Sequence, residues 1–178
     1  ALAGLLFGLA CFAFVAIFKW LFIGRYKPRQ TPMWTPFVWL SEATTNMYEG
    51  MTIPNFMRYL RGTPWLPLAF NLLGAKIASS AYMDTTDITE FDCVEIGEHS
   101  ELNALSCPQT HLFEDRVMKV DTVRIGSRVT VGARSTILYG ASVADGVRLG
   151  PMTLIMKGED LPANTAWHGI PAEPQTAS

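Results

Sequence analysis

A six-residue repeat in the C-terminal half constrains this chain more than any other feature. An aliphatic residue recurs at every sixth position, in the series Ile125, Val131, Ile137, Val143, Leu149 and Ile155. A second series lies four positions further on, with Val129, Ser135, Ala141, Val147 and Thr153. A period of six matches neither the 3.6 residues of a helical turn nor the alternation of a flat strand. It predicts an all-β fold, a left-handed parallel β-helix over residues 75–178 with a narrow aliphatic core.

An earlier block carries the same pattern less regularly. Its inward positions are Ile77, Met83, Ile96, Ser100 and Leu102. The step from Leu102 to Ile125 takes 23 residues, whereas a complete coil of three six-residue strands takes 18. The excess predicts a loop extruded from the β-helix at about residues 107–122. Long excursions from a regular scaffold usually carry function.

The chain opens with a strongly apolar run, and residues 1–18 contain no charged side chain. A run of this length is what a helix needs to cross ~30 Å of hydrocarbon, so we predict a transmembrane helix over residues 1–24. Basic residues follow it at Lys19, Arg25, Lys27 and Arg29. The positive-inside rule then places the β-helix domain in the cytoplasm.

Two other interpretations of this run are a cleaved signal peptide and a buried core helix. The charges follow the apolar run instead of preceding it, and no small-residue cleavage site stands out, which argues against a signal peptide. The first residue is an alanine inside the run, so we expect the chain to be a piece of a longer polypeptide.

Residues 25–74 combine Trp, Phe, Leu and Pro with isolated charges. Prolines near the start of two segments suit the first turn of a helix, where the missing N–H has no partner to lose. We predict two short amphipathic helices that lie in the membrane interface with their apolar faces down, contacting lipid. The alternative is that these helices pack on the β-domain as a lid.

Composition limits the partners and the chemistry. The net charge of -2 provides no basic surface, so nucleic acid is not expected as a partner. Cys11, Cys93 and Cys107 have no paired spacing, which favours a reducing compartment over a disulfide framework. The three histidines are far apart in the sequence, so no metal site is predicted.

The candidate general base is His111, because it stands in the extruded loop with acidic residues close behind it. A neutral imidazole can take a proton from an attacking amine or hydroxyl, and a carboxylate can fix its tautomer. We therefore assign His111, Glu114 and Asp115 to catalysis and Arg116 to substrate binding. The alternative is a loop histidine that only hydrogen-bonds the backbone.

Four further residues are candidates with an equally simple structural explanation. Asn103 precedes the loop and could orient a substrate or stabilise a turn. Glu90 and Asp92 lie in the segment ITEFDCVEIG and could face the same cleft or be solvated. We assign these three to substrate binding. Cys107 could act as a nucleophile, but a small buried thiol is the more economical interpretation.

Two resemblances to known families extend these predictions. The ending KGEDLPANTAWHGIPA resembles the close of the maltose and galactoside acetyltransferase family, in which a histidine of the protruding loop is the general base. Over nearly the whole chain, segments such as THLFEDR and LGPMTLIMKGE resemble the C-terminal region of membrane-bound nonribosomal peptide synthetases typified by poly-lysine synthetase. Asn71 departs from that family, where a basic residue is expected.

The resemblance implies an acyltransferase that joins a carrier-bound aminoacyl thioester to a free amino acid. No cofactor is expected to be bound tightly, since the donor is the phosphopantetheine thioester of a carrier-protein domain. Implied partners are membrane lipids, the amino acid substrate and homologous β-helix domains in a trimer or pseudo-trimer. The alternatives are an acetyltransferase that uses acetyl-CoA and a catalytically silent assembly module.

Overall fold

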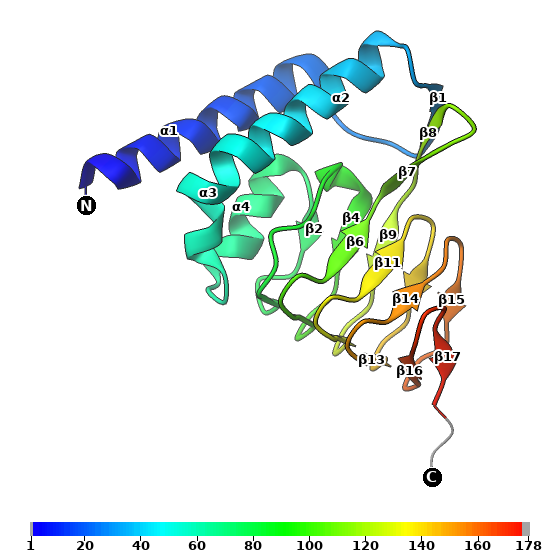
Figure 1. Ribbon diagram of the computed structural model, residues 1–178. Helices are drawn as coiled ribbons and strands as arrows, with labels where there is room; N and C mark the ends of the chain where they lie inside the picture. Colours follow the sequence, from blue (N-terminus) through cyan, green and yellow to red (C-terminus); the bar gives the residue numbers. More distant parts are fainter. Residues whose placement is uncertain (1, 176–178) are drawn as a thin grey trace.

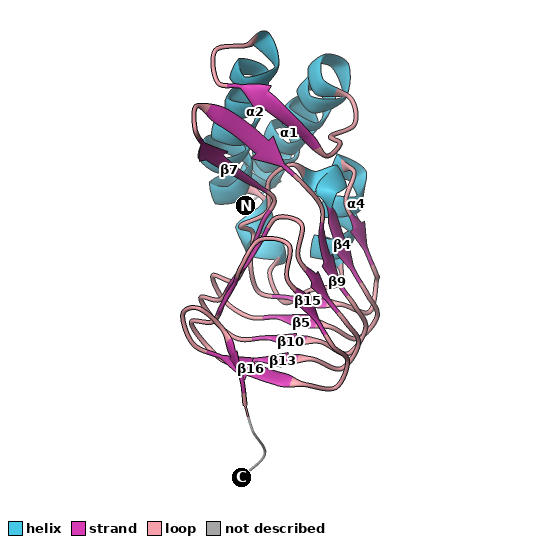
Figure 2. Ribbon diagram, turned by 90° about the vertical axis from the view of Figure 1, so that its right-hand side faces the viewer, coloured by secondary structure: helices cyan, strands magenta, loops and turns pink. Residues whose placement is uncertain are grey.

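A computed structural model describes residues 2–175 and divides them into two structural parts (Figure 1). Helices dominate the first part, as far as residue 73, and short strands make up the second. The helices lie together over one end of the stacked strands (Figure 2). The predicted all-β class is therefore corrected to a parallel β-helix with a substantial helical part.

The β-helix has three parallel faces. The first face contains β2 (Lys76–Ile77), β4 (Val94–Ile96), β9 (Val123–Ile125), β12 (Ser142–Val143) and β15 (Asp160–Leu161). The second contains β3 (Tyr82–Met83), β5 (Glu101–Leu102), β10 (Thr130–Val131), β13 (Arg148–Leu149) and β16 (Ala166–His168), and β17 (Glu173–Pro174) pairs antiparallel at its edge. The third contains β6 (Cys107–Gln109), β11 (Thr136–Leu138) and β14 (Leu154–Ile155).

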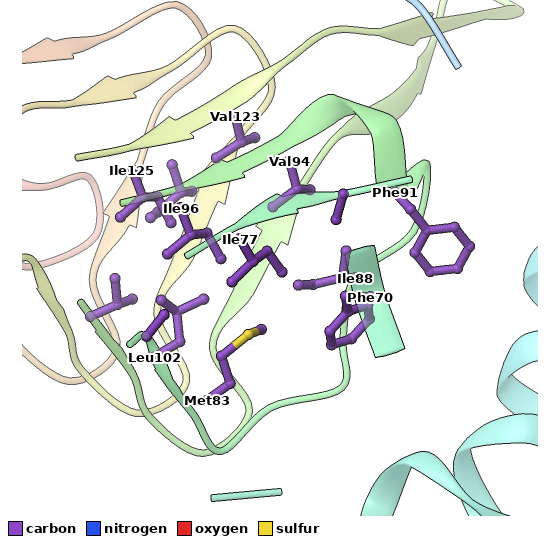
Figure 3. Packing of buried hydrophobic residues seen from close by; sticks show 14 of the residues in the cluster. Phe70, Ile77, Met83, Ile88, Phe91, Val94, Ile96, Leu102, Val123 and Ile125 are labelled. Atoms are coloured by element: carbon purple, nitrogen blue, oxygen red, sulfur yellow. The ribbon is translucent and has the colours of Figure 1, made fainter. Parts of the chain in front are cut away.

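The register confirms the six-residue period. Residues one complete coil apart are partners, so Ile125 lies between Ile96 and Val143. Every member of the first aliphatic series is at most 3% exposed, and every member of the second at most 1%. These side chains form one continuous core, part of which is seen in Figure 3.

Close stacking of the coils requires glycine at some corners. A Cβ on Gly132 would lie 2.5 Å from the carbonyl carbon of Gly150 in the next coil. A Cβ on Gly97 would lie 2.6 Å from the carbonyl carbon of Gly126. Both contacts are with backbone atoms that cannot rotate away, so the small residues of the repeat are sterically necessary.

The helical part begins with α1 (Leu2–Phe18), which continues into a π-helical turn, Lys19–Ile23. Strand β1 (Arg29–Pro32) follows, then α2 (Pro36–Met47) and a second π-helical turn, Tyr48–Thr52. The short α3 (Ile53–Asn55), a 3₁₀ turn (Met57–Leu60) and α4 (Trp65–Leu73) complete it. Proline occupies the first turn of α2 and of α3, as the sequence predicts.

Helix α4 closes the first coil of the β-helix. Phe70 and Leu73 are fully buried in the same core as Ile77 and Met83 (Figure 3). The main apolar side of α4 therefore faces protein, although Leu68 and other side chains on its opposite side are exposed. The interfacial arrangement predicted for this segment is corrected in favour of the lid.

Helix α1 packs on the other helices along one side. Gly8, Cys11, Val15 and Lys19 are buried at the three- and four-residue spacing of one helix face. At this side the carbonyl oxygen of Cys11 accepts a hydrogen bond from Thr52 Oγ1 at 3.4 Å. The segment Leu2–Ile23 is long and apolar enough to cross a membrane, and only 22% of its most apolar window is buried.

The extruded segment is a β-hairpin rather than an irregular loop. Strands β7 (His111–Glu114) and β8 (Val117–Val120) pair antiparallel, and β1 pairs with the outer edge of β8. The preceding strand β6 remains in the β-helix, where it pairs with β11. The predicted excursion of 107–122 is therefore shortened to the hairpin, which reaches toward the helices (Figure 2).

Candidate functional site

His111 is the first residue of the hairpin, directly after the chain leaves the third face of the β-helix. Its Nδ1 lies 2.7 Å from Oε2 of Glu90. The His111 side chain is 13% exposed, whereas the Glu90 side chain is fully buried. The structure therefore joins two of the predicted site residues in a histidine–carboxylate pair that reaches solvent only at the imidazole.

Three hydroxyl groups hold the Glu90 carboxylate in place. Thr110 Oγ1 and Thr89 Oγ1 donate to Oε2 at 2.6 Å and 2.9 Å, and Ser41 Oγ of α2 donates to Oε1 at 3.4 Å. The backbone of Glu90 is left-handed, with φ 37°, at the start of the 3₁₀ turn Phe91–Cys93. A buried carboxylate needs such donors to remain ionised.

The two groups shift each other in opposite directions. Burial is the largest influence on His111 and lowers its pKa, but the hydrogen bond and charge of Glu90, with the charge of Glu42, outweigh burial and hold the pKa above its ordinary value. For Glu90, burial raises the pKa, but His111 and the threonine hydroxyls outweigh it and hold the pKa below its ordinary value. A carboxylate partner thus makes this imidazole a stronger base.

His111 opens on a cavity of about 390 Å³ between the helices and the β-helix. Residues of α2 and the following π-helical turn form one wall, including Glu42, Tyr48 and Glu49. The segment 86–89 and strand β6 form the other wall. The site is therefore completed by a segment that was predicted to lie at the membrane surface.

Glu114 and its neighbours lie away from this pair. The Glu114 carboxylate accepts from Lys157 Nζ at 2.6 Å, Lys119 Nζ at 2.9 Å and Tyr139 Oη at 3.1 Å. The hydrogen bond from Lys157, followed by that from Lys119, lowers the pKa of Glu114 to about 2. Its position fastens the hairpin to the β-helix, so the predicted contact with His111 is wrong.

Asp115 and Arg116 form the tip of the hairpin, both with left-handed φ values (53° and 61°), as in a two-residue turn. Neither lines the cavity. Asn103 lies at a β-helix corner, where its Nδ2 donates to the carbonyl oxygen of Val131 at 3.0 Å. The turn-stabilising interpretation of Asn103 describes this contact.

Asp92 also has a structural environment. Its Oδ2 lies 2.6 Å from Lys19 Nζ and accepts the backbone N–H of Tyr26 at 3.1 Å. Lys19 is fully buried and Asp92 is 10% exposed, so this ion pair joins the end of α1 to the β-helix. The predicted substrate-binding role of Asp92 has no support from this geometry.

Cys107 lines the cavity, and its Sγ donates to Oε1 of Gln109 at 3.3 Å. Burial raises the pKa of this thiol to about 12, so the group is protonated near neutral pH and a poor nucleophile. Among residues 2–175, no cluster of three or more His, Cys, Asp or Glu side chains is arranged to hold a metal ion.

The acidic wall of the cavity, made by Glu42, Glu49 and Asp87, was not predicted from the sequence. Glu42 and Glu49 are seven residues apart on a helical segment, a spacing that puts both on one face. That periodicity was the available signal. It did not indicate that this face would lie opposite His111.

Comparison with known proteins agrees with the resemblance drawn from the sequence motifs. Over 173 residues, 97% of this chain, the sequence is 59% identical to delta-poly-L-ornithine synthetase of Acinetobacter baumannii (strain AB307-0294). The chain is homologous to one segment of that synthetase. It spans 13% of the synthetase's length. No family model matches the sequence.

Solved structures with similar folds are acyltransferases by name. Neisseria gonorrhoeae serine acetyltransferase is 13% identical with a TM-score of 0.41, covering 95% of this chain and 69% of that one. Soybean serine acetyltransferase in complex with serine is 18% identical with a TM-score of 0.41, covering 93% and 70%. A maltose O-acetyltransferase from Clostridium difficile 630 is 22% identical with a TM-score of 0.34, covering 46% and 43%.

Proposed function

We propose that this chain is an acyltransferase domain that forms an amide bond between a carrier-bound aminoacyl thioester and a free amine. The observation that carries this proposal is the buried His111–Glu90 pair opening on a cavity of about 390 Å³. Homology to a segment of a poly-ornithine synthetase supports it, because a synthetase of that name must join amino acids by amide bonds. The donor is the phosphopantetheine thioester of a carrier-protein domain.

The reaction is a direct transfer. Because Nδ1 of His111 is engaged with Glu90, Nε2 is the nitrogen that accepts a proton. His111 takes this proton from the acceptor amine as its nitrogen adds to the thioester carbonyl carbon. The C–S bond then breaks, and the imidazolium returns the proton to the leaving thiolate. A thioester is already activated, so no covalent intermediate on the protein is required.

Membrane attachment and assembly belong to the same proposal. Helix α1 anchors the domain to membrane lipids through its exposed apolar sides, with the β-helix in the cytoplasm. Large apolar residues remain exposed on the β-helix, at Leu105, Phe113, Met152 and Met156. Homologous β-helix domains packed beside it, in a trimer or pseudo-trimer, would cover such surface.

The decisive experiment is single-turnover transfer from a loaded carrier domain to a free amino acid. We expect His111→Ala to reduce the rate by about 10²–10⁴-fold, the usual contribution of a positioned general base. His99→Ala and His168→Ala are matched controls, because neither histidine lines the cavity. Thermal unfolding and membrane sedimentation of all three variants should match the parent.

Two results would contradict the proposal. Full activity of a folded His111→Ala variant would place the base elsewhere. Transfer from acetyl-CoA to the same amines, without transfer from the loaded carrier, would indicate a CoA-dependent acetyltransferase. If neither donor is used by the parent protein, the domain is an assembly module.

A further inference from the structure

The cavity in front of His111 is one-sided in charge. Glu42, Glu49 and Asp87 contribute carboxylates to its walls, and within residues 2–175 it has no lysine or arginine in its lining. Acidic residues alone would make this only a negatively charged surface. What distinguishes this one is that the catalytic imidazole proposed above opens into the same space.

Glu42 stands out among the three acidic residues. Its Oε1 is buried, and no group within residues 2–175 lies at hydrogen-bonding distance from it. A buried carboxylate oxygen without a donor is costly, since it has lost its water and gained nothing in return. Glu90 of the same site shows the opposite arrangement, with four donors around its carboxylate.

The electrostatics place Glu42 close to the reacting group. The charge of Glu42 raises the pKa of His111, and the charge of His111 in turn opposes the effect of burial on the pKa of Glu42. Burial is the largest influence on Glu42 and raises its pKa. A cationic group from the acceptor would supply what the protein does not: a charged donor for Oε1.

We infer that Glu42 is a specificity-determining residue that pairs with an ammonium group of the acceptor while a second amine of the same molecule lies at His111. The chemical class selected is therefore a primary amine that carries a further positive charge. An ammonium–carboxylate contact inside a cavity is stronger than one in open solvent, and it positions the neutral amine for attack. The inference rests on the proposed function for the location of the reaction.

Binding alone can test this, without any acyl donor. The two probes are 1,4-diaminobutane and 4-amino-1-butanol, which have the same length and differ only in the second ammonium group. We expect the purified full chain in detergent to bind the diamine about 10- to 100-fold more tightly, the range for a hydrogen bond to a charged partner. Calorimetric or NMR titration measures both affinities.

Variants then assign the preference to one residue. Glu42→Gln should abolish most of the preference for the diamine, and Glu42→Asp, which keeps the charge, should retain part of it. Glu49→Gln removes the same charge from an exposed position on the same wall and should have a smaller effect. His111→Ala should keep the preference, because it removes the base and not the ammonium site.

The outcomes are separable from those of the transfer experiment. Equal binding of the two probes by the parent, or an unchanged preference in Glu42→Gln, would overturn the inference even if transfer depends on His111. The same holds if Glu49→Gln and Glu42→Gln are equivalent, since the charge of the whole wall would then be responsible. A clear preference lost only in Glu42→Gln supports the assignment even if the acyl donor proves to be acetyl-CoA.

Discussion

At the scale of single residues, the chemistry depends on the balance at His111. Burial opposes the imidazolium, while Glu90 and Glu42 stabilise it, and the net effect is a raised pKa. The base is active only when neutral, so activity is lost as the pH falls through this raised pKa. We expect the acidic limb of the pH profile of kcat/KM to lie above about 6.5, the ordinary value of histidine.

Glu90→Gln provides the matched variant for this profile. Without the carboxylate charge, burial becomes the dominant influence on His111, so the limb should move to lower pH while the maximal rate falls. A limb that stays in place in a folded Glu90→Gln variant would show that Glu90 does not control the imidazole. The amide keeps the size of the side chain, which limits other changes.

At the scale of elements, the tightness of the β-helix corners is the testable property. Gly132→Ala would place a Cβ 2.5 Å from backbone atoms of Gly150 and Pro151, which cannot move without separating two coils. We expect a loss of about 1–3 kcal/mol or more in the free energy of unfolding, as for other overpacked sites. The measurement is unfolding by denaturant in detergent.

Gly150→Ala is the control at the equivalent corner one coil later. Its added Cβ would first meet the His168 Cβ at 3.3 Å, a contact that a shift of a few tenths of an ångström relieves. Similar losses in the two variants would mean that the corners require glycine for another reason than contact between coils.

At the scale of the whole molecule, the testable property is the side of the membrane on which the domain lies. The basic residues after α1 predict that the β-helix lies in the cytoplasm. A cysteine at the exposed Asp160 of β15, with Cys11, Cys93 and Cys107 replaced by alanine, should react with a membrane-impermeant maleimide only after cells are permeabilised. Labelling in intact cells would reverse the predicted orientation.

The helical part is also where the sequence-based prediction and the structure differ most. The apolar residues of α4 were predicted to contact lipid, but Phe70 and Leu73 complete the protein core instead. Composition does not distinguish these two uses, because burying an apolar side chain in protein or in lipid removes it equally from water. The difference depends on the open end of the β-helix that needed a cover.

The sequence by itself determined the β-helix, its inward residues and the position of His111 at its excursion. Those properties follow from a period that is local in the chain, since each strand repeats the same short pattern. Only the tertiary structure decided that Glu90, 21 residues from His111, and not Glu114, is the partner of the imidazole. It also brought Glu42 of α2 to the same cavity. Contacts between distant segments arise from packing of the helices on the coil end, and no spacing in the sequence encodes that packing.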